Sequence, residues 1–281
     1  MSTLVPPLFV GLVDDASLLP PSMTSVAEAL ESFRAHENAW YAELLGSFLV
    51  PSSLVDFDRS WPALPVGVVH DVVISALPSA VAKLRAAGAV VRQAEAAVAR
   101  RGEDPQPGLA ELRRLAGQSQ DLAVYAEIPL SWGLLAALDT VAEARAEGLP
   151  IAPKFRVGGL AAELFPTPVE LAAVICACRD RDLPFKLAAG LRHALRHTDP
   201  ETGFTHHGFL NVLVAGLVAV DGAEVAEVAE VLAATHPVPL IEPARARRDG
   251  PRPLLRGFGT TSVLEPLTEL IRLGLINGGY E

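Results

Sequence analysis

Lysine is scarce in this chain of 281 residues, and its rarity draws attention to each position where it occurs. Of the 23 basic residues, three are lysine (Lys83, Lys154 and Lys186), which leaves 20 arginines. Arginine stays protonated in proteins and cannot act as a nucleophile, whereas lysine can lose its proton when its surroundings lower its pKa. Lys154 and Lys186 are therefore the first candidates for a reactive site.

Both lysines lie in short segments that are typical of consecutive β-strands, Lys154–Val157 and Phe185–Ala189. Side chains alternate between the two faces of a strand, so Lys154 and Arg156 share one face and the apolar residues between them occupy the other. Neighbouring strands lie about 4.8 Å apart, which brings two lysine side chains close together. We expect both ammonium groups to face the inside of a sheet or barrel.

Two paired lysines are suited to Schiff-base chemistry. A lysine with an ordinary pKa of about 10.4 is protonated and cannot attack a carbonyl carbon. A second cation beside it, or a dry environment, lowers the pKa and frees the lone pair. The alternative is that each ammonium group neutralises a carboxylate, such as that of Glu127, inside the fold. The sequence leaves both alternatives open.

Strands that alternate with helices predict the scaffold that positions these residues. The expected strands are Leu8–Val13, Ser47–Val50, Val66–Val73, Ala89–Gln93, Leu122–Ile128, Lys154–Val157, Phe185–Ala189 and Leu254–Phe258. The clearest helices are Val26–His36, Ser79–Ala87, Trp132–Glu147, Pro168–Arg181 and Val263–Leu273. Capping boxes support three helix starts, at Ser25/Glu28, Thr167/Glu170 and Ser262/Glu265.

Eight strands in a chain of this length predict a single (β/α)8 TIM-like barrel over residues 1–281. An open doubly wound sheet is less favoured, because no G-x-G-x-x-G motif follows the first strand. The segment between the seventh and eighth strands, approximately 191–253, is an insertion. It comprises a loop (Leu191–Gly208), one or two helices (Phe209–Thr235) and a connector rich in proline and arginine (His236–Pro253). The PQPG segment around Gln106 is expected to be an exposed loop.

The C-terminal half resembles the class I, Schiff-base aldolases of the deoxyribose-phosphate aldolase type. That family carries K-T-S-T-G, K-A-S-G-G-I-R and G-T-S-S on its last three strands. The corresponding segments here begin at Lys154 (K-F-R-V-G), Lys186 (K-L-A-A-G-L-R) and Gly259 (G-T-T-S). The resemblance covers roughly Lys154–Ser262 and is interrupted by the insertion.

This resemblance implies that Lys154 forms the imine and that Lys186 lowers its pKa. The chain departs from the family where Phe155, Arg156 and Val157 replace small hydroxyl residues, and where Ala189 replaces a glycine that helps to bind phosphate. The departures are consistent either with another substrate or with a barrel that has kept the scaffold and lost the reaction.

Several further residues are candidates for the same site. Glu127 ends the fifth strand, either as a catalytic group or as the ion-pair partner of a lysine or of Arg156. The Gly259-Thr260-Thr261-Ser262 segment precedes a helix and offers hydroxyls and backbone N–H groups to an anion, or simply caps that helix. Arg156 and Arg192 are candidates for binding an acidic substrate. His70 or Asp71 could face the barrel interior, and Asp14 and Asp15 are expected in a turn or at a helix cap.

Four histidines gather in the insertion, at His193, His197, His206 and His207. Histidines four residues apart can share a metal ion on a helix, but an H-x-x-x-H pattern without an intervening glutamate is weak evidence. A polar loop over the mouth of the barrel is favoured over a zinc site. We expect that loop to bring Arg192 or a histidine toward Lys154.

Composition limits the partners. The net charge of −10 and pI of about 5.2 give no basic surface for nucleic acid or an anionic membrane. The longest apolar stretch, Phe209–Val220, is shorter than the roughly 20 residues of a membrane-spanning helix. The first residues lack the basic region of a signal peptide, and Cys176 and Cys178 are spaced for neither a disulfide nor a zinc clip. These features predict a cytoplasmic protein with a small-molecule substrate, with self-association into a homo-oligomer left open.

The leading prediction is therefore a carbon–carbon lyase that forms a lysine imine with a small carbonyl compound, with or without a phosphate group, and needs no cofactor. Two alternatives are retained. One is a divalent-metal barrel enzyme that uses the histidine cluster. The other is a barrel that binds a small acidic metabolite without turning it over.

Overall fold

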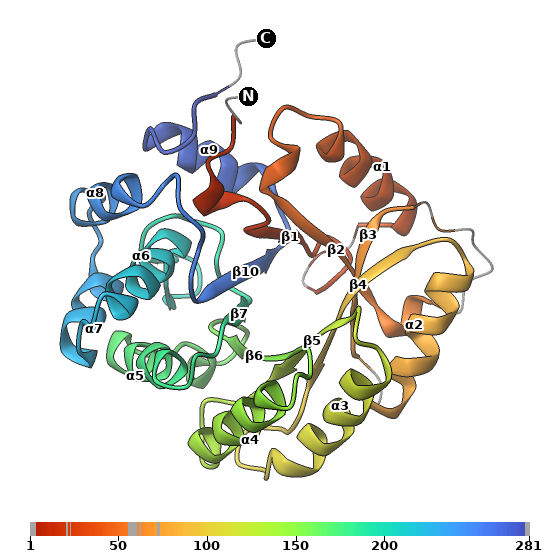
Figure 1. The fold of residues 1–281 in the computed structure, drawn as a ribbon. Helices are drawn as coiled ribbons and strands as arrows, with labels where there is room; N and C mark the ends of the chain where they lie inside the picture. The colour runs from red at the N-terminus through yellow and green to blue at the C-terminus, as the bar shows by residue number, and fades with distance from the viewer. Residues whose placement is uncertain are drawn as a thin grey trace.

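Eight parallel strands of the described chain close into a barrel in the computed structural model of the protein (Figure 1). The structure describes residues 4–278 except for 21, 23, 56–60, 62 and 72–73. Around the barrel the strands are β1 (Val13–Asp15), β2 (Leu45–Pro51), β3 (Pro65–Val69), β4 (Val90–Ala97), β5 (Ala123–Glu127), β6 (Ile151–Arg156), β7 (Phe185–Ala188) and β10 (Leu255–Thr260). β10 pairs with β1 and completes the circle, which confirms the predicted (β/α)8 architecture.

Helices surround the barrel on the outside (Figure 1). They are α1 (Val26–Glu37), α2 (Leu77–Ala86), α3 (Gln106–Gln118), α4 (Leu134–Ala146), α5 (Pro168–Arg179), α6 (Phe209–Val220), α7 (Val225–Ala233), α8 (Val238–Ala246) and α9 (Leu264–Arg272). None of those in the described part of the chain combines the length and the apolar character that a membrane crossing requires.

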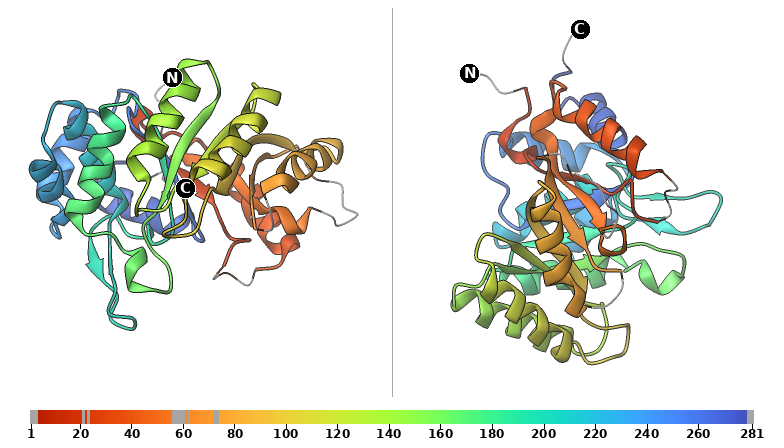
Figure 2. Two further views of the ribbon diagram at one scale, coloured as in Figure 1. Left: turned by 90° about the horizontal axis from the view of Figure 1, so that it is seen from below. Right: turned by 90° about the vertical axis from the view of Figure 1, so that its right-hand side faces the viewer.

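The insertion lies between β7 and β10, as the sequence predicts. It contains a short antiparallel hairpin, β8 (His197–Thr198) and β9 (Thr205–His206), which projects from one end of the barrel in Figure 2. α6, α7 and α8 follow the hairpin. The expected connector at His236–Pro253 is therefore wrong in part, because α8 occupies much of it. Pro237 and Pro239 lie at the start of that helix, at positions where a missing backbone N–H is tolerated.

The first predicted strand, Leu8–Val13, is wrong in its bounds. Pro7–Phe9 forms a 3-10 turn, and β1 begins only at Val13. The turn starts with Pro7, whose fixed φ suits a first helical position, and Gly11 then takes a φ of +62°. Leu8 and Phe9 are fully buried, so their hydrophobicity reflects packing in the core and not a strand.

The PQPG segment is also not a loop. Gln106 is the first residue of α3, and Pro107 lies in its first turn, where proline is tolerated. Gly108 packs so closely that a Cβ atom there would lie 2.1 Å from the carbonyl oxygen of Val98. The close approach of helix and strand accounts for a glycine that suggests a turn when only the sequence is considered.

Capping boxes form at Ser25/Glu28 and Thr167/Glu170, as predicted. At the third site, the Glu265 amide donates to the Ser262 hydroxyl at 3.4 Å, but α9 begins two residues later, at Leu264. α5 carries the second box and lies in the chain between β6 and β7, the two strands that hold Lys154 and Lys186. Its two cysteines are both buried, and neither forms a disulfide.

Candidate active site

Five charged side chains meet inside the barrel and form what we call the lysine network: Asp14, Glu95, Glu127, Lys154 and Lys186. They come from β1, β4, β5, β6 and β7. Lys154 and Lys186 are paired in register on neighbouring strands and both are buried, as strand alternation predicts. Charged groups in a low-dielectric interior persist only when they are paired, and here every member has an opposite charge beside it.

Each lysine contacts two carboxylates. Lys154 Nζ lies 2.8 Å from Glu95 Oε2 and 2.9 Å from Glu127 Oε2. Lys186 Nζ lies 2.5 Å from Glu95 Oε1 and also donates to Asp14 Oδ2. Glu95 therefore uses one carboxylate oxygen for each lysine. Its side chain is only 1% exposed, so the interaction is shielded from water.

Both lysine pKa values are raised, which is the opposite of the expected depression of Lys154 by Lys186. Burial lowers the pKa of Lys154, but Glu127 and Glu95 outweigh it and hold the ammonium charged. Burial also lowers the pKa of Lys186, but Asp14 and Glu95 raise it by more, so the pKa of Lys186 lies above its usual value. The expected depression came from the neighbouring cation, whereas in the structure Glu95 lies between the two lysines, and Glu127 and Asp14 each pair with one of them.

The carboxylates respond in the opposite sense. Burial raises the pKa of Glu95, but Lys154 and Lys186 reverse this effect and bring it to about 2. Burial also raises the pKa of Glu127, but Lys154 and Arg156 lower it by more, so the pKa of Glu127 lies below its usual value. The resting site is thus a set of charged groups. Together with Arg156, three carboxylates and three cations balance.

Neutral groups hold the network in place. Gln93 Nε2 donates to Asp14 Oδ2 at 3.0 Å and to Glu95 Oε1 at 3.1 Å. The Ser47 amide donates to Asp14 Oδ1 at 2.6 Å. The Tyr125 ring lies 4.7 Å from Lys186 Nζ, a cation–π distance. These contacts fix the lysines in one arrangement.

Glycines in the neighbouring strands make room for these side chains. A Cβ atom on Gly46 would overlap the Asp14 carboxylate, and one on Gly67 would lie 2.7 Å from the Gln93 side chain. Glycine weakens a strand, so its presence on inward positions of β2 and β3 marks places where a side chain of the adjacent strand, β1 or β4, approaches the backbone.

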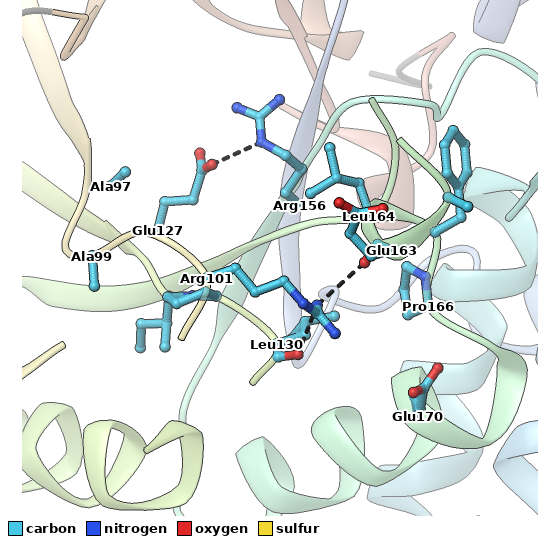
Figure 3. Close-up of a pocket in the computed structure, with 14 residues that line it drawn as sticks. Ala97, Ala99, Arg101, Glu127, Leu130, Arg156, Glu163, Leu164, Pro166 and Glu170 are labelled. Carbon is cyan, nitrogen blue, oxygen red and sulfur yellow. Dashed lines mark hydrogen bonds and ion pairs between the residues drawn. The ribbon is translucent and has the colours of Figure 1, made fainter. Parts of the chain in front are cut away.

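A cavity of about 360 Å³ opens beside the network, over the ends of β4, β5 and β6 (Figure 3). Glu127 lines it and links it to Lys154. Arg156 lines it as well, and its Nε donates to Glu127 Oε1 at 2.9 Å. Glu127 is thus an ion-pair partner of both Lys154 and Arg156, the alternative that the sequence left open beside a catalytic role.

The Gly259–Ser262 segment is placed differently from expectation. Gly259 and Thr260 belong to β10, and the Thr260 hydroxyl is taken up by the Ser262 backbone. The Thr261 hydroxyl accepts from Arg192 Nη2 at 2.8 Å, and Arg192 also pairs with Glu265 at 3.6 Å. Much of the hydrogen-bonding capacity predicted for an anion is therefore used within the protein.

The loop that carries the four histidines, Leu191–Gly208, makes contacts with α9 and with Pro166. His193 Nδ1 lies 2.9 Å from Glu269 on α9, and the rings of His197 and His206 stack at 5.2 Å. His207 is buried and donates through Nε2 to the Pro166 carbonyl at 2.8 Å. No described residue of the loop makes a hydrogen bond or ion pair with Lys154 or Lys186, contrary to the expected approach of Arg192 or a histidine.

The described residues also do not form the metal site that the alternative of a divalent-metal enzyme requires. Among them, no group of three or more histidine, cysteine, aspartate and glutamate side chains is arranged to hold a metal ion. A second cavity of about 360 Å³ lies beside His193 and His197, separate from the lysine network, and shares its wall with α9.

Sequence reasoning missed two members of the network. Asp14 was expected in a turn, but it lies in β1 and reaches Lys186. Glu95 was overlooked because the fourth strand was ended at Gln93, whereas β4 continues to Ala97. The available signal was alternation, since Gln93 and Glu95 are two apart with Ala94 between them, and Ala96 and Ala97 follow. Asp71 caps the Ser52–Ser53 turn and does not join the network.

No protein-family model matches the chain, and neither a curated protein nor a solved structure matches it.

Proposed function

We propose that the protein is a lyase of the aldolase kind that forms an imine between Lys154 and a small carbonyl compound. The observation that carries the proposal is the position of Lys154. Its amine is buried at the carboxyl end of a barrel strand, between two carboxylates, one of which lines an open cavity. Enzymes built on this fold place their chemistry at that end of the strands.

Lys154 is a better candidate for the nucleophile than Lys186. Glu127 connects Lys154 to the cavity, whereas Lys186 is held by Asp14 and Glu95 and lies against the Tyr125 ring. A carbonyl compound in the cavity would therefore meet Lys154 first. Lys186 supplies a fixed positive charge on the far side of Glu95.

The carboxylates favour the product of imine formation. The amine first gives a proton to a neighbouring carboxylate and then attacks the carbonyl carbon, and the resulting carbinolamine loses water. The protonated imine carries the same single positive charge as the ammonium group it replaces. Glu95 and Glu127, which stabilise the ammonium of Lys154, stabilise the iminium equally.

Proton release is the costly step of this scheme, because the pKa of Lys154 is raised. Glu95 and Glu127 are weak bases while Lys154 is charged. Their pKa values rise as the ammonium loses its proton, because that charge is a main cause of their depression. After that proton is lost, Lys186 remains charged beside Glu95 and Arg156 beside Glu127, so each carboxylate keeps one cation that opposes its protonation.

A second candidate function is favoured by the same raised pKa values. A barrel whose lysines stay protonated can bind a small acidic metabolite without reacting with it. This alternative needs the cavity and its cations but no neutral amine.

Borohydride trapping distinguishes the two functions. The protein is incubated with small aldehydes and ketones at neutral to mildly alkaline pH, reduced, and mapped by mass spectrometry. Because the chain has only three lysines, the exposed Lys83 serves as an internal control. We expect the adduct on Lys154 and its loss in Lys154→Arg, which keeps the charge. Labelling of Lys83 alone, or the absence of any adduct, would contradict the lyase function and support the binding function.

A further inference from the structure

The cavity beside Lys154 contains a guanidinium group with unused donors. Arg156 donates through Nε to Glu127, which fixes the plane of its side chain. Within the described part of the chain, its two terminal nitrogens make no hydrogen bond, and its side chain is 45% exposed. A guanidinium held in this way presents a fork that matches an anionic oxygen pair.

Arg101 places a second cation on the opposite side of the cavity. Its Nη1 donates to the carbonyl oxygens of Leu130 and Glu163, at 3.1 Å and 3.2 Å (Figure 3). Both acceptors are neutral. Arg101 makes no ion pair with any described carboxylate, but Glu170 in the same cavity wall is near enough that Arg101, after the Thr167 hydrogen bonds, helps to lower the pKa of that carboxyl.

The acidic groups around the cavity limit the charge of its ligand. Glu127 is neutralised by Lys154 and Arg156. Glu170 also lines the cavity, but it serves the capping box of α5, where Thr167 N and Oγ1 donate to its Oε2. With Glu163, the lining carries two cations and three carboxylates. A monoanion is therefore favoured over a dianion, and a carboxylate over a phosphate.

The remaining walls of the cavity are apolar. Leu130, Leu164, Phe165 and Pro166 line it from the loops that follow β5 and β6. Such walls favour the burial of a hydrocarbon body and offer few partners to a ligand rich in hydroxyl groups.

Strand geometry sets the distance between the two ends of the ligand. Lys154 and Arg156 are two residues apart on one face of β6, so their Cα atoms are about 6.6 Å apart. A molecule that places its carbonyl carbon at Lys154 and its anion at Arg156 is consequently short, with a few carbon atoms between the two groups.

We propose that the site takes short oxo acids, with the carboxylate bound by Arg156, the charge of Arg101 attracting it from across the cavity, and the carbonyl presented to Lys154. This inference rests on the proposed function for the carbonyl end alone. The carboxylate end rests on the cavity and its arginines, and it is testable without any reaction.

The first experiment compares matched carbonyl compounds in the trapping assay. These are 4-oxopentanoate, its neutral methyl ester and 3-oxobutyl phosphate, with 7-oxooctanoate as a longer acid. We expect half-maximal labelling of Lys154 at a concentration at least tenfold lower for 4-oxopentanoate than for the other three. Arg156→Met should remove that preference, and Arg156→Lys should restore only part of it because the fork is lost. Equal labelling by acid and ester, or better labelling by the phosphate, overturns the inference.

The second experiment measures binding without chemistry. Pentanoate has no carbonyl group to react, and its binding to the intact protein is measured by calorimetry. We expect binding that is lost in Arg156→Met and weakened in Arg101→Met. It should be unchanged in Arg113→Met, which alters a half-buried arginine of α3 that pairs with Glu147 and does not line the cavity. No binding to the wild type, or equal binding by all variants, overturns the carboxylate site.

The two experiments separate the two proposals. Labelling of Lys154 with no preference for the acid supports the imine and overturns the oxo-acid inference. Binding of pentanoate through Arg156 without any adduct supports the carboxylate site and overturns the imine.

Discussion

Lys154 is paired in register with Lys186 on the next strand, and the carboxylate of Glu95 lies between their ammonium groups. Two like charges on adjacent strands would repel each other, and repulsion would lower both pKa values. The intervening carboxylate changes the sign of the effect. The pair is thus built to hold positive charge, and any reaction at Lys154 must first remove a proton against that field.

The rate of imine formation should therefore rise with pH. A raised pKa means that the neutral amine is rare near pH 7, and its fraction increases as the pH approaches the pKa of Lys154 from below. Glu127→Gln removes a charge that raises this pKa, so the profile should shift to lower pH. The measurement is the pH dependence of borohydride trapping, with Lys154→Arg as the blank. A shift to higher pH, or none, contradicts the electrostatic explanation.

Removal of Glu95 should destabilise the fold strongly. Glu95→Leu leaves two buried ammonium groups with one partner fewer each, and breaking a buried ion pair from one side costs about 3–5 kcal/mol. The matched control is Glu147→Leu, which breaks the exposed pair with Arg113 and should cost less than about 1 kcal/mol. Urea denaturation at pH 7 measures both. Similar losses in the two variants would show that the network contributes little.

The sequence predicted the barrel because its pattern is local. Alternation and capping boxes each act over a few residues, and the eight predicted strands all correspond to barrel strands. The errors occur where a distant contact decides the structure. Leu8 and Phe9 are apolar because the core covers them, and Gly108 is a glycine because Val98 lies against it. Neither reason is visible in the neighbouring sequence.

In the candidate site too, local patterns could be predicted from the sequence, whereas effects of distant contacts could not. Lys154 and Lys186 were found because lysine is scarce and strand alternation places both on the inner face, and Glu127 was found because it ends the fifth predicted strand. Their electrostatics could not be found in this way, because the pKa of Lys154 depends on Glu95, which is 59 positions away in the chain. Asp14 is more distant still and joins only because β1 closes the barrel against β10.

Ala189 offers a test of local strain beside the site. It follows β7 with a φ of +64°, a left-handed conformation that favours glycine. Such a conformation costs an alanine about 1–2 kcal/mol, and the greater unfolded-state entropy of glycine offsets about half of the gain. We expect Ala189→Gly to stabilise the protein by about 1 kcal/mol in urea denaturation. Ala188→Gly, in the regular strand β7, should instead destabilise it. If both substitutions destabilise the protein, the backbone of Ala189 is not strained.

His207 should make the protein sensitive to acid at a mild pH. Burial lowers its pKa to about 4, and nearby Arg196 adds to the effect, while its hydrogen bond to the Pro166 carbonyl opposes it. The unfolded chain binds the proton at about pH 6.5, whereas the folded protein resists it until about pH 4. Stability is therefore complete above pH 6.5 and falls as the pH drops through this window, by about 3 kcal/mol from this residue.

The test replaces His207 with glutamine, which keeps a donor for the Pro166 carbonyl but does not titrate. Between pH 7 and pH 4 the wild type should lose about 3 kcal/mol more unfolding free energy than His207→Gln, as measured by urea denaturation at each pH. The difference isolates His207, because carboxylates that titrate in the same range are common to both proteins. His236→Gln, at an exposed histidine, should follow the wild type. Parallel curves for His207→Gln and the wild type would show that the buried imidazole is not the acid-sensitive group.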